Sequence, residues 1–126
     1  MGGEAAPRVV LVVEDEPLVR ENIADELRGY GWHVLEAASG EDALSLMADN
    51  QIDVVFMDIQ LPGHMSGWEI AEALRTRVPA LPIVYTSGHG CDPARQVAGS
   101  LFIRKPYAAG FIIEACYNLM AEPDIR

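Results

Sequence analysis

Short apolar runs alternate along the chain with stretches in which apolar residues recur every three or four positions. A continuous apolar run is typical of a strand that is covered on both faces of a sheet, whereas the longer spacing is typical of one buried helix face. We therefore predict strands at residues 9–13, 33–37, 54–57, 83–85 and 101–103.

Helix signals lie between these runs. Pro17 suits the first turn of a helix, and Ser39 and Ser66 each precede an acidic residue by three positions, as capping residues do. Helices are predicted from Pro17 to about Gly29, from Ser39 to Asn50, from Ser66 to Val78 and from Ala108 to Leu119. The segment 88–100 contains Gly90, Pro93 and Gly99, so its helix should be short or irregular.

Strands that alternate with helices indicate a parallel sheet with helices on both faces. The first, third and fourth strands are the most uniformly apolar and should be central, whereas His33 and Glu36 in the second and the polar flank of the fifth suit edges. The prediction is a doubly wound (βα)5 sheet of order 2-1-3-4-5, with a shortened fourth helix. Its ligand crevice should lie beyond the carboxyl ends of the first and third strands.

Length and charge narrow the function. The chain has 126 residues, enough for one domain, predicted at residues 8–122 with flexible termini at 1–7 and 123–126. Its 19 acidic against 9 basic residues give a charge of −10, which disfavours direct binding to nucleic acid or to anionic membranes. No apolar run is long enough to span a membrane and no secretory signal is evident, so a cytoplasmic location is expected.

Polar residues follow the predicted strands at the edge where the carboxyl ends meet. They are Glu14 and Asp15 after the first strand, Asp58 after the third, Thr86 and Ser87 after the fourth, and Lys105 after the fifth. Three neighbouring carboxylates repel one another unless a cation is present, and Mg²⁺ prefers such oxygen ligands. A lysine, a hydroxyl and an aspartate nucleophile beside Mg²⁺ suit phosphoryl transfer.

Each of these residues also has a purely structural interpretation. The acidic residues before Pro17 could cap a helix, and Lys105 and Ser87 could each belong to an ordinary turn. Asp58 is harder to explain in this way, because burying a carboxylate at the end of an apolar strand is costly unless it is paired or bound to a metal. The joint placement of the residues, rather than any single one, favours a functional site.

Four ordered motifs strongly resemble the receiver domain of two-component response regulators, over roughly residues 8–120. They are VVEDEP at 12–17, VVFMDIQLPG at 54–63, PIVYTSG at 82–88 and RKPY at 104–107. The resemblance implies a flavodoxin-like fold in which Asp58 accepts a phosphoryl group from a phosphohistidine. It also implies Mg²⁺ held by Glu14, Asp15, Asp58 and the backbone carbonyl of Gln60.

The same resemblance implies further roles near the phosphoacceptor. Lys105 matches the lysine that contacts the phosphoryl group, and Ser87, five positions after Pro82, matches the switch hydroxyl better than Thr86 does. Phe102 matches an aromatic residue that turns inward on activation. The implied partners are a sensor histidine kinase or a histidine phosphotransfer protein, a downstream protein target, and in some receivers a second copy of the domain. No enzymatic activity is expected beyond phosphorylation and dephosphorylation of the domain itself.

Three details depart from the commonest receiver pattern. The loop 62–67 is one residue longer, Glu14 replaces a more frequent aspartate, and the interval from Ser87 to Lys105 is several residues shorter. The short interval is the one that predicts a truncated fourth helix, in a region through which many receivers dimerise.

Other readings stay open at this stage. The chain could be a fragment of a larger regulator or of a hybrid histidine kinase, although Met1 and the short tail favour a free-standing regulator. A Mg²⁺-dependent phosphatase with an aspartate nucleophile would need a second acid two residues later, where this chain has Gln60. A flavodoxin-like phosphate-binding module would need small polar residues where Glu14, Asp15 and Glu16 stand.

Overall fold

The computed structural model describes residues 8–61, 63–88, 95–105, 107 and 109–121, and contains a five-stranded parallel sheet of order β2-β1-β3-β4-β5. The predicted strand order is confirmed. The elements are β1 (Val9–Val13), α1 (Pro17–Gly29), β2 (His33–Ala37), α2 (Gly40–Asp49), β3 (Val54–Asp58), α3 (Gly67–Arg77), β4 (Ile83–Ser87), β5 (Leu101–Arg104) and α4 (Ala109–Ala121).

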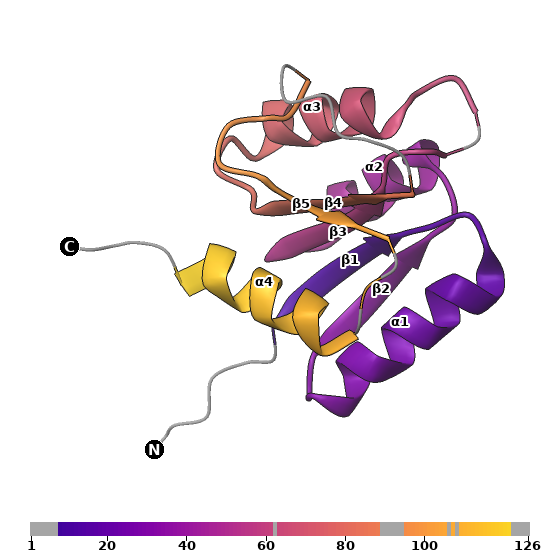
Figure 1. Ribbon diagram of the computed structural model, residues 1–126. Helices are drawn as coiled ribbons and strands as arrows, with labels where there is room; N and C mark the ends of the chain where they lie inside the picture. The colour runs from indigo at the N-terminus through magenta and orange to yellow at the C-terminus, as the bar shows by residue number, and fades with distance from the viewer. Residues whose placement is uncertain (1–7, 62, 89–94, 106, 108, 122–126) are drawn as a thin grey trace.

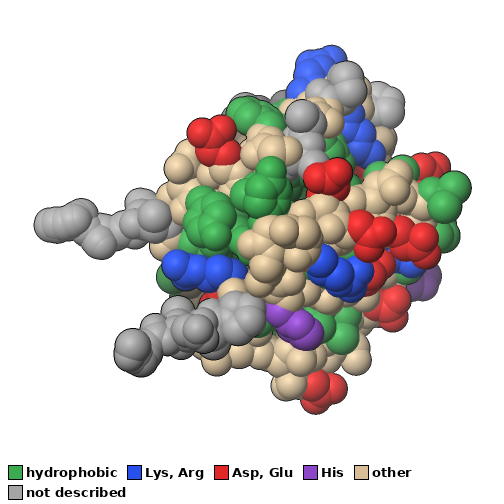
Figure 2. All heavy atoms as spheres, turned by 90° about the horizontal axis from the view of Figure 1, so that it is seen from below, with side chains coloured by type: hydrophobic (Ala, Val, Ile, Leu, Met, Phe, Trp, Pro, Cys, Tyr) green, Lys and Arg blue, Asp and Glu red, His purple; other side chains and the backbone are tan. Residues whose placement is uncertain are grey.

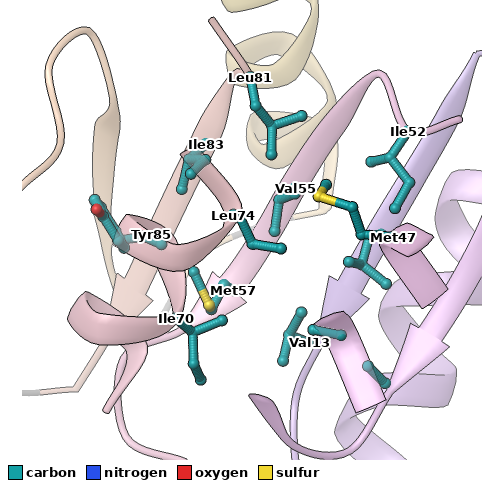
Figure 3. Close-up of a cluster of buried hydrophobic side chains, with 14 of the residues drawn as sticks. Val13, Met47, Ile52, Val55, Met57, Ile70, Leu74, Leu81, Ile83 and Tyr85 are labelled. Atoms are coloured by element: carbon teal, nitrogen blue, oxygen red, sulfur yellow. The ribbon is translucent and has the colours of Figure 1, made fainter. Parts of the chain in front are cut away.

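Helices cover both faces of the sheet (Figure 1): α2 and α3 lie on one face, and α1 and α4 lie on the other. Successive strand residues point to opposite faces, so each central strand supplies both cores. Val55 and Met57 of β3 pack under α2 and α3, as Figure 3 shows, whereas Val54 and Phe56 pack under α1 and α4. Residues 9–13, 54–57 and 83–85 of the central strands are therefore apolar on both faces, as the sequence pattern predicts.

The fourth connection differs from a regular βα unit. In its described part, residues 95–100, the chain forms turns and no helix; the remainder of the expected short helix lies outside the described residues. The backbone N–H of Val97 donates to the Tyr85 hydroxyl at 3.2 Å. The Tyr85 ring lies 4.8 Å from that of Trp68, so a buried aromatic pair anchors the turn to the sheet.

Strands β3 and β4 are each longer than predicted. β3 ends at Asp58 rather than at residue 57, and β4 ends at Ser87 rather than at residue 85. The sequence pattern missed these ends because it recognises strands by apolar side chains, and the last residues of both strands are polar. The candidate site residues Asp58 and Ser87 are thus held by strand hydrogen bonding instead of belonging to loops.

A close backbone approach fixes α3 beside the end of β3. The N–H of Gly67 donates to the carbonyl of Ile59 at 2.8 Å. A Cβ atom at position 67 would lie 2.5 Å from Ile59 Cα and 3.0 Å from the Asp58 carbonyl oxygen. Only glycine therefore allows the helix to start this close to Asp58.

We expect Gly67→Ala to lower the free energy of unfolding by about 2 kcal/mol, because the obstructing atoms are backbone and cannot move aside. Gly110→Ala is the matched control, since a Cβ there meets nothing within 4 Å; it should leave stability unchanged or raise it by up to about 1 kcal/mol. Urea unfolding of both variants measures the difference, and equal stabilities would contradict the prediction.

Candidate functional site

The ends of three strands bring together two carboxylates and one ammonium group. Lys105, just after β5, places its Nζ 2.7 Å from Asp58 Oδ2 and 3.8 Å from Glu14 Oε1. Glu14 and Asp58 are only 3% and 5% exposed. The structure thus unites three of the predicted site residues around one buried ion cluster.

Backbone N–H groups hold the other carboxylate oxygens. Asp58 Oδ1 accepts a hydrogen bond from the N–H of Gln60 at 2.9 Å, and Glu14 Oε2 accepts one from the N–H of Glu16 at 3.1 Å. Each acid therefore turns back onto its own loop, two residues ahead. This geometry orients both carboxylates before any ligand arrives.

The surroundings of this cluster disfavour the charged form of Glu14. Burial is the main reason why the pKa of Glu14 is raised from 4.5 to about 7, and the charge of Asp58 raises it further, against the opposing effects of the Glu16 N–H and Lys105. Burial alone would lower the pKa of Lys105, but its hydrogen bond to Asp58 and the acidic charges around it give a net increase. Lys105 consequently stays charged while Glu14 titrates near neutral pH.

Tyr107 lies near this cluster, two residues after Lys105. Burial raises the pKa of Tyr107 to about 12, with smaller contributions from the charges of Glu14 and Asp58. Its ring makes an edge-on contact with Phe56 at 5.7 Å between centroids. The phenol therefore stays neutral beside the two acids.

Two buried residues with hydroxyl groups end strand β4. Ser87 and Thr86 are 2% and 1% exposed, and Thr86 pairs in register with Asp58 of β3. Thr86 Oγ1 has no hydrogen-bond partner among the described residues. An unsatisfied buried hydroxyl costs about 1–3 kcal/mol, so Thr86 carries a cost that the sequence did not reveal.

The remaining predicted site residues lie around the cluster rather than in it. Asp15 and Gln60 are exposed, on the loops that follow β1 and β3. Phe102 of β5 is half-buried, pairs in register with Tyr85 and packs against the core under α2 and α3.

A divalent metal fits the donor set at this edge. Across the described residues, no group of three Asp, Glu, His or Cys side chains is arranged to hold a metal by itself. Mg²⁺ does not require one, since it is commonly held by one or two carboxylates with water molecules completing its shell. Burial, and to a smaller extent the charge of Asp58, raises the pKa of Glu14, and a bound cation would stabilise the charged form of this acid.

Arg20 is a site residue that sequence reasoning missed. Its Nη1 donates to the Glu14 carbonyl at 2.9 Å, and its Nε lies 3.2 Å from Glu36 Oε1. Arg28 contacts the other oxygen of Glu36 at 3.0 Å. Glu36, which dilutes the apolar pattern of β2, is thus the anchor of an arginine that fixes the loop after β1. A polar residue inside an edge strand was the available signal.

Comparison with known proteins places this geometry in a family. A family model of the response regulator receiver domain matches residues 10–116. The chain belongs to this family. Receiver domains are signalling modules of two-component systems, and the resemblance predicted from the four sequence motifs is confirmed.

Curated receiver relatives include proteins much longer than this chain. The probable transcriptional regulatory protein TcrX of Mycobacterium tuberculosis is 31% identical over 109 residues, which cover 83% of this chain and 46% of that protein. The sensor histidine kinase RcsC of Salmonella typhimurium is 32% identical over 88 residues, 70% of this chain and 9% of that protein. The chain therefore spans less than half the length of these relatives.

Solved receiver structures share the fold over nearly the whole chain. A receiver protein from Sinorhizobium medicae WSM419 superimposes with a TM-score of 0.85 at 29% identity, covering 90% of this chain and 94% of that one. The response regulator TrrA from Thermotoga maritima, solved in complex with Mg(2+)-BeF, gives a TM-score of 0.80 at 29% identity, covering 89% and 98%. In the described part of the present receiver, no helix is long and apolar enough to cross a membrane.

The pKa of Glu14 predicts how stability depends on pH. Because this pKa is raised from 4.5 to about 7, the folded receiver binds the proton more tightly than the unfolded chain does. The resulting stability is fully present below about pH 4.5 and is lost as the pH rises through about 7. Glu14→Gln, which resembles the protonated acid, should therefore raise the free energy of unfolding by about 1–3 kcal/mol at pH 8 and by little at pH 5.

Urea unfolding at pH 5 and pH 8, without divalent metal, measures this difference. Glu21→Gln, at an exposed position of α1, is the matched control and should show no such pH dependence. An equal effect of Glu14→Gln at both pH values would contradict the assignment.

Proposed function

We propose that this receiver is the phosphoacceptor of a two-component phosphorelay, with Asp58 taking a phosphoryl group from a phosphohistidine. The observation that carries the proposal is the buried Asp58 carboxylate, 5% exposed and paired with Lys105 at 2.7 Å. Such a carboxylate is oriented and lies beside a cation that can interact with an incoming phosphoryl group. An acid with a purely structural role would not be buried next to a second acid such as Glu14, because the two carboxylates repel each other.

The transfer is a substitution at phosphorus. One Asp58 oxygen bonds to phosphorus while the bond to the histidine nitrogen breaks, and the electron pair returns to the imidazole, which then takes up a proton. Lys105 lies where its ammonium can follow the negative charge from Asp58 to the phosphoryl oxygens. The N–H of Gln60 holds the carboxylate in position during the approach.

Glu14, Asp15, Asp58 and the Gln60 carbonyl are the groups that would hold Mg²⁺. When bound, the ion would neutralise charge on the phosphoryl oxygens. Glu14 contributes most when deprotonated, so metal binding should release its proton near neutral pH. Asp15 is exposed beside the buried pair and completes the acidic rim.

Ser87 and Phe102 are the proposed switch. Ser87 ends β4 next to the acceptor strand, and Phe102 lies on the adjacent β5. Attraction of the Ser87 hydroxyl to the phosphoryl group would change the space available to the half-buried Phe102 ring. Phosphorylation thereby biases an existing two-state element and alters the surface offered to a downstream protein.

A groove beside Lys105 is the proposed docking site for the phosphohistidine protein. It has a volume of about 880 Å³ and lies between α1 and the β5–α4 connection, with Asp25, Glu26, Tyr30 and Tyr107 in its lining. Figure 2 shows hydrophobic side chains gathered on the face that it draws, with both acidic and basic side chains around them. A partner with an apolar surface and basic side chains would fit this chemistry.

Charge reversal in the groove tests this docking site. Glu26→Lys should slow phosphotransfer by about tenfold from any phosphohistidine protein that labels the unmodified receiver. Labelling by acetyl phosphate should be unchanged, because that donor is too small to use the groove. Glu72→Lys, at an exposed position of α3 on the other face, is the control. Equal slowing by both reversals would indicate a general charge effect and contradict the groove.

The proposal extends to the protein's setting. We infer a cytoplasmic receiver domain spanning residues 8–122, with no enzymatic activity beyond its own phosphorylation and dephosphorylation, and with a homodimer as one output state. The chain is either a free-standing regulator or the receiver of a larger regulator or hybrid kinase, since its relatives include long proteins. The phosphatase alternative is disfavoured by Gln60, which offers no acid two residues after Asp58.

Phosphorylation of Asp58 can be measured directly. With Mg²⁺ and acetyl phosphate, the unmodified receiver should gain the mass of one phosphoryl group, and hydroxylamine should remove it, as expected of an acyl phosphate. Asp58→Asn should gain none, because an amide is a poor nucleophile, whereas Asp49→Asn, at the exposed end of α2, should behave as the unmodified receiver. No gain of mass by the unmodified receiver, or an equal gain by Asp58→Asn, would overturn the proposed function.

A further inference from the structure

Thr86 carries a buried hydroxyl that the proposed mechanism does not use. Its side chain is 1% exposed, and Oγ1 has no hydrogen-bond partner in the part of the chain that the structure describes. A hydroxyl can donate one hydrogen bond and accept two. Native proteins rarely leave such a group unsatisfied, so each exception calls for an explanation.

The position of Thr86 relates it to the phosphoacceptor. Thr86 pairs in register with Asp58 on one side and with Ile103 on the other. Strand alternation puts its side chain on the same face as Val84 and puts Asp58 on the same face as Phe56, and both of those reference residues belong to the core under α1 and α4. Thr86 and Asp58 are therefore same-face neighbours at the end of the sheet.

Lys105 reaches over this position. It lies two residues beyond Ile103, and its Nζ reaches Asp58 at 2.7 Å although β4 separates β5 from β3. The ion pair thus spans the end of β4, where Thr86 lies. The hydroxyl is thus buried at the strand end that the Lys105 side chain crosses, and this cation is expected to move when phosphate arrives.

In the unmodified receiver, both carboxylate oxygens of Asp58 already accept hydrogen bonds from other groups. Lys105 Nζ donates to Oδ2, and the N–H of Gln60 donates to Oδ1. Phosphorylation changes this arrangement, because one oxygen becomes the bridge to phosphorus and the phosphoryl oxygens compete for the ammonium. When Oδ1 is the bridging oxygen, Oδ2 becomes an acyl carbonyl oxygen that loses the Lys105 ammonium as its donor.

We propose that Thr86 is a positioning residue of the modified state, whose hydroxyl donates to the Asp58 acyl group when Lys105 turns to the phosphoryl oxygens. The inference rests on the proposed role of Asp58 as phosphoacceptor. In the unmodified receiver the buried Thr86 hydroxyl has no partner among the described residues and lowers the stability of the fold. In the modified receiver it gains a hydrogen bond, which stabilises that state. Such a difference between states shifts a two-state equilibrium toward the modified form.

Thr86→Val and Thr86→Ser separate this role from a merely structural one. Valine keeps the shape but has no hydroxyl, so it should raise the melting temperature of the unmodified receiver by removing an unsatisfied group. Serine keeps the hydroxyl and serves as the conservative control. Beryllium fluoride with Mg²⁺ is the probe, because it imitates a phosphoryl group on a carboxylate at equilibrium.

Thermal unfolding with Mg²⁺ alone and with Mg²⁺ plus beryllium fluoride measures the affinity for the probe. Thr86→Val should bind the probe about tenfold more weakly than the unmodified receiver, as expected for loss of one strong hydrogen bond. Thr86→Ser should stay within about threefold of it.

Three outcomes decide between the inferences. Weaker binding by Thr86→Val together with retention by Thr86→Ser supports the role of Thr86. Equal binding by all three proteins overturns that role alone and leaves the phosphoacceptor proposal standing. If the unmodified receiver neither binds beryllium fluoride nor is labelled by acetyl phosphate, both proposals are overturned.

Discussion

The site depends on the burial of two carboxylates beside a single ammonium group. Glu14 and Asp58 are almost fully removed from solvent, and Lys105 is 2.7 Å from one and 3.8 Å from the other. Buried charges are stable only when they are paired, and one lysine does not balance two acids. Burial raises the pKa of Glu14 to about 7, and the nearby charge of Asp58 adds to this increase. A further cation, or a proton on Glu14, would reduce the repulsion between the two acids. The site can therefore respond to ligands.

The fold maintains this imbalance by holding the acids rigidly. Parallel strands with alternating faces place Glu14 and Asp58 at neighbouring carboxyl ends, and backbone N–H groups two residues ahead fix the carboxylates. Arg20 holds the Glu14 carbonyl from α1, and Gly67 lets α3 begin against the backbone after Asp58. Without these constraints the acids could turn to water, and the raised pKa of Glu14 would relax.

The sequence pattern predicts the sheet and the convergence of the acids, because both follow from apolar periodicity and from the geometry of parallel strands. The strand order is confirmed, and the meeting of Glu14, Asp58 and Lys105 follows from it. The anchoring of Arg20 by Glu36 could not be predicted, since it depends on which rotamers two long side chains adopt across α1 and β2. The unsatisfied Thr86 hydroxyl depends on strand register, where a shift of one residue would reverse the face.

Strand β4 joins the site to the shortened fourth connection. Tyr85 faces α3, where its hydroxyl accepts a hydrogen bond from the N–H of Val97 and its ring contacts Trp68. The next residue, Thr86, faces Asp58, and Ser87 ends the strand. Because strand residues alternate, a displacement of β4 that moves Thr86 relative to Asp58 also moves Tyr85 relative to the turn at residues 95–100. A single strand therefore carries both Tyr85, which holds the fourth connection, and Thr86, which lies beside the phosphoacceptor, so the two must move together.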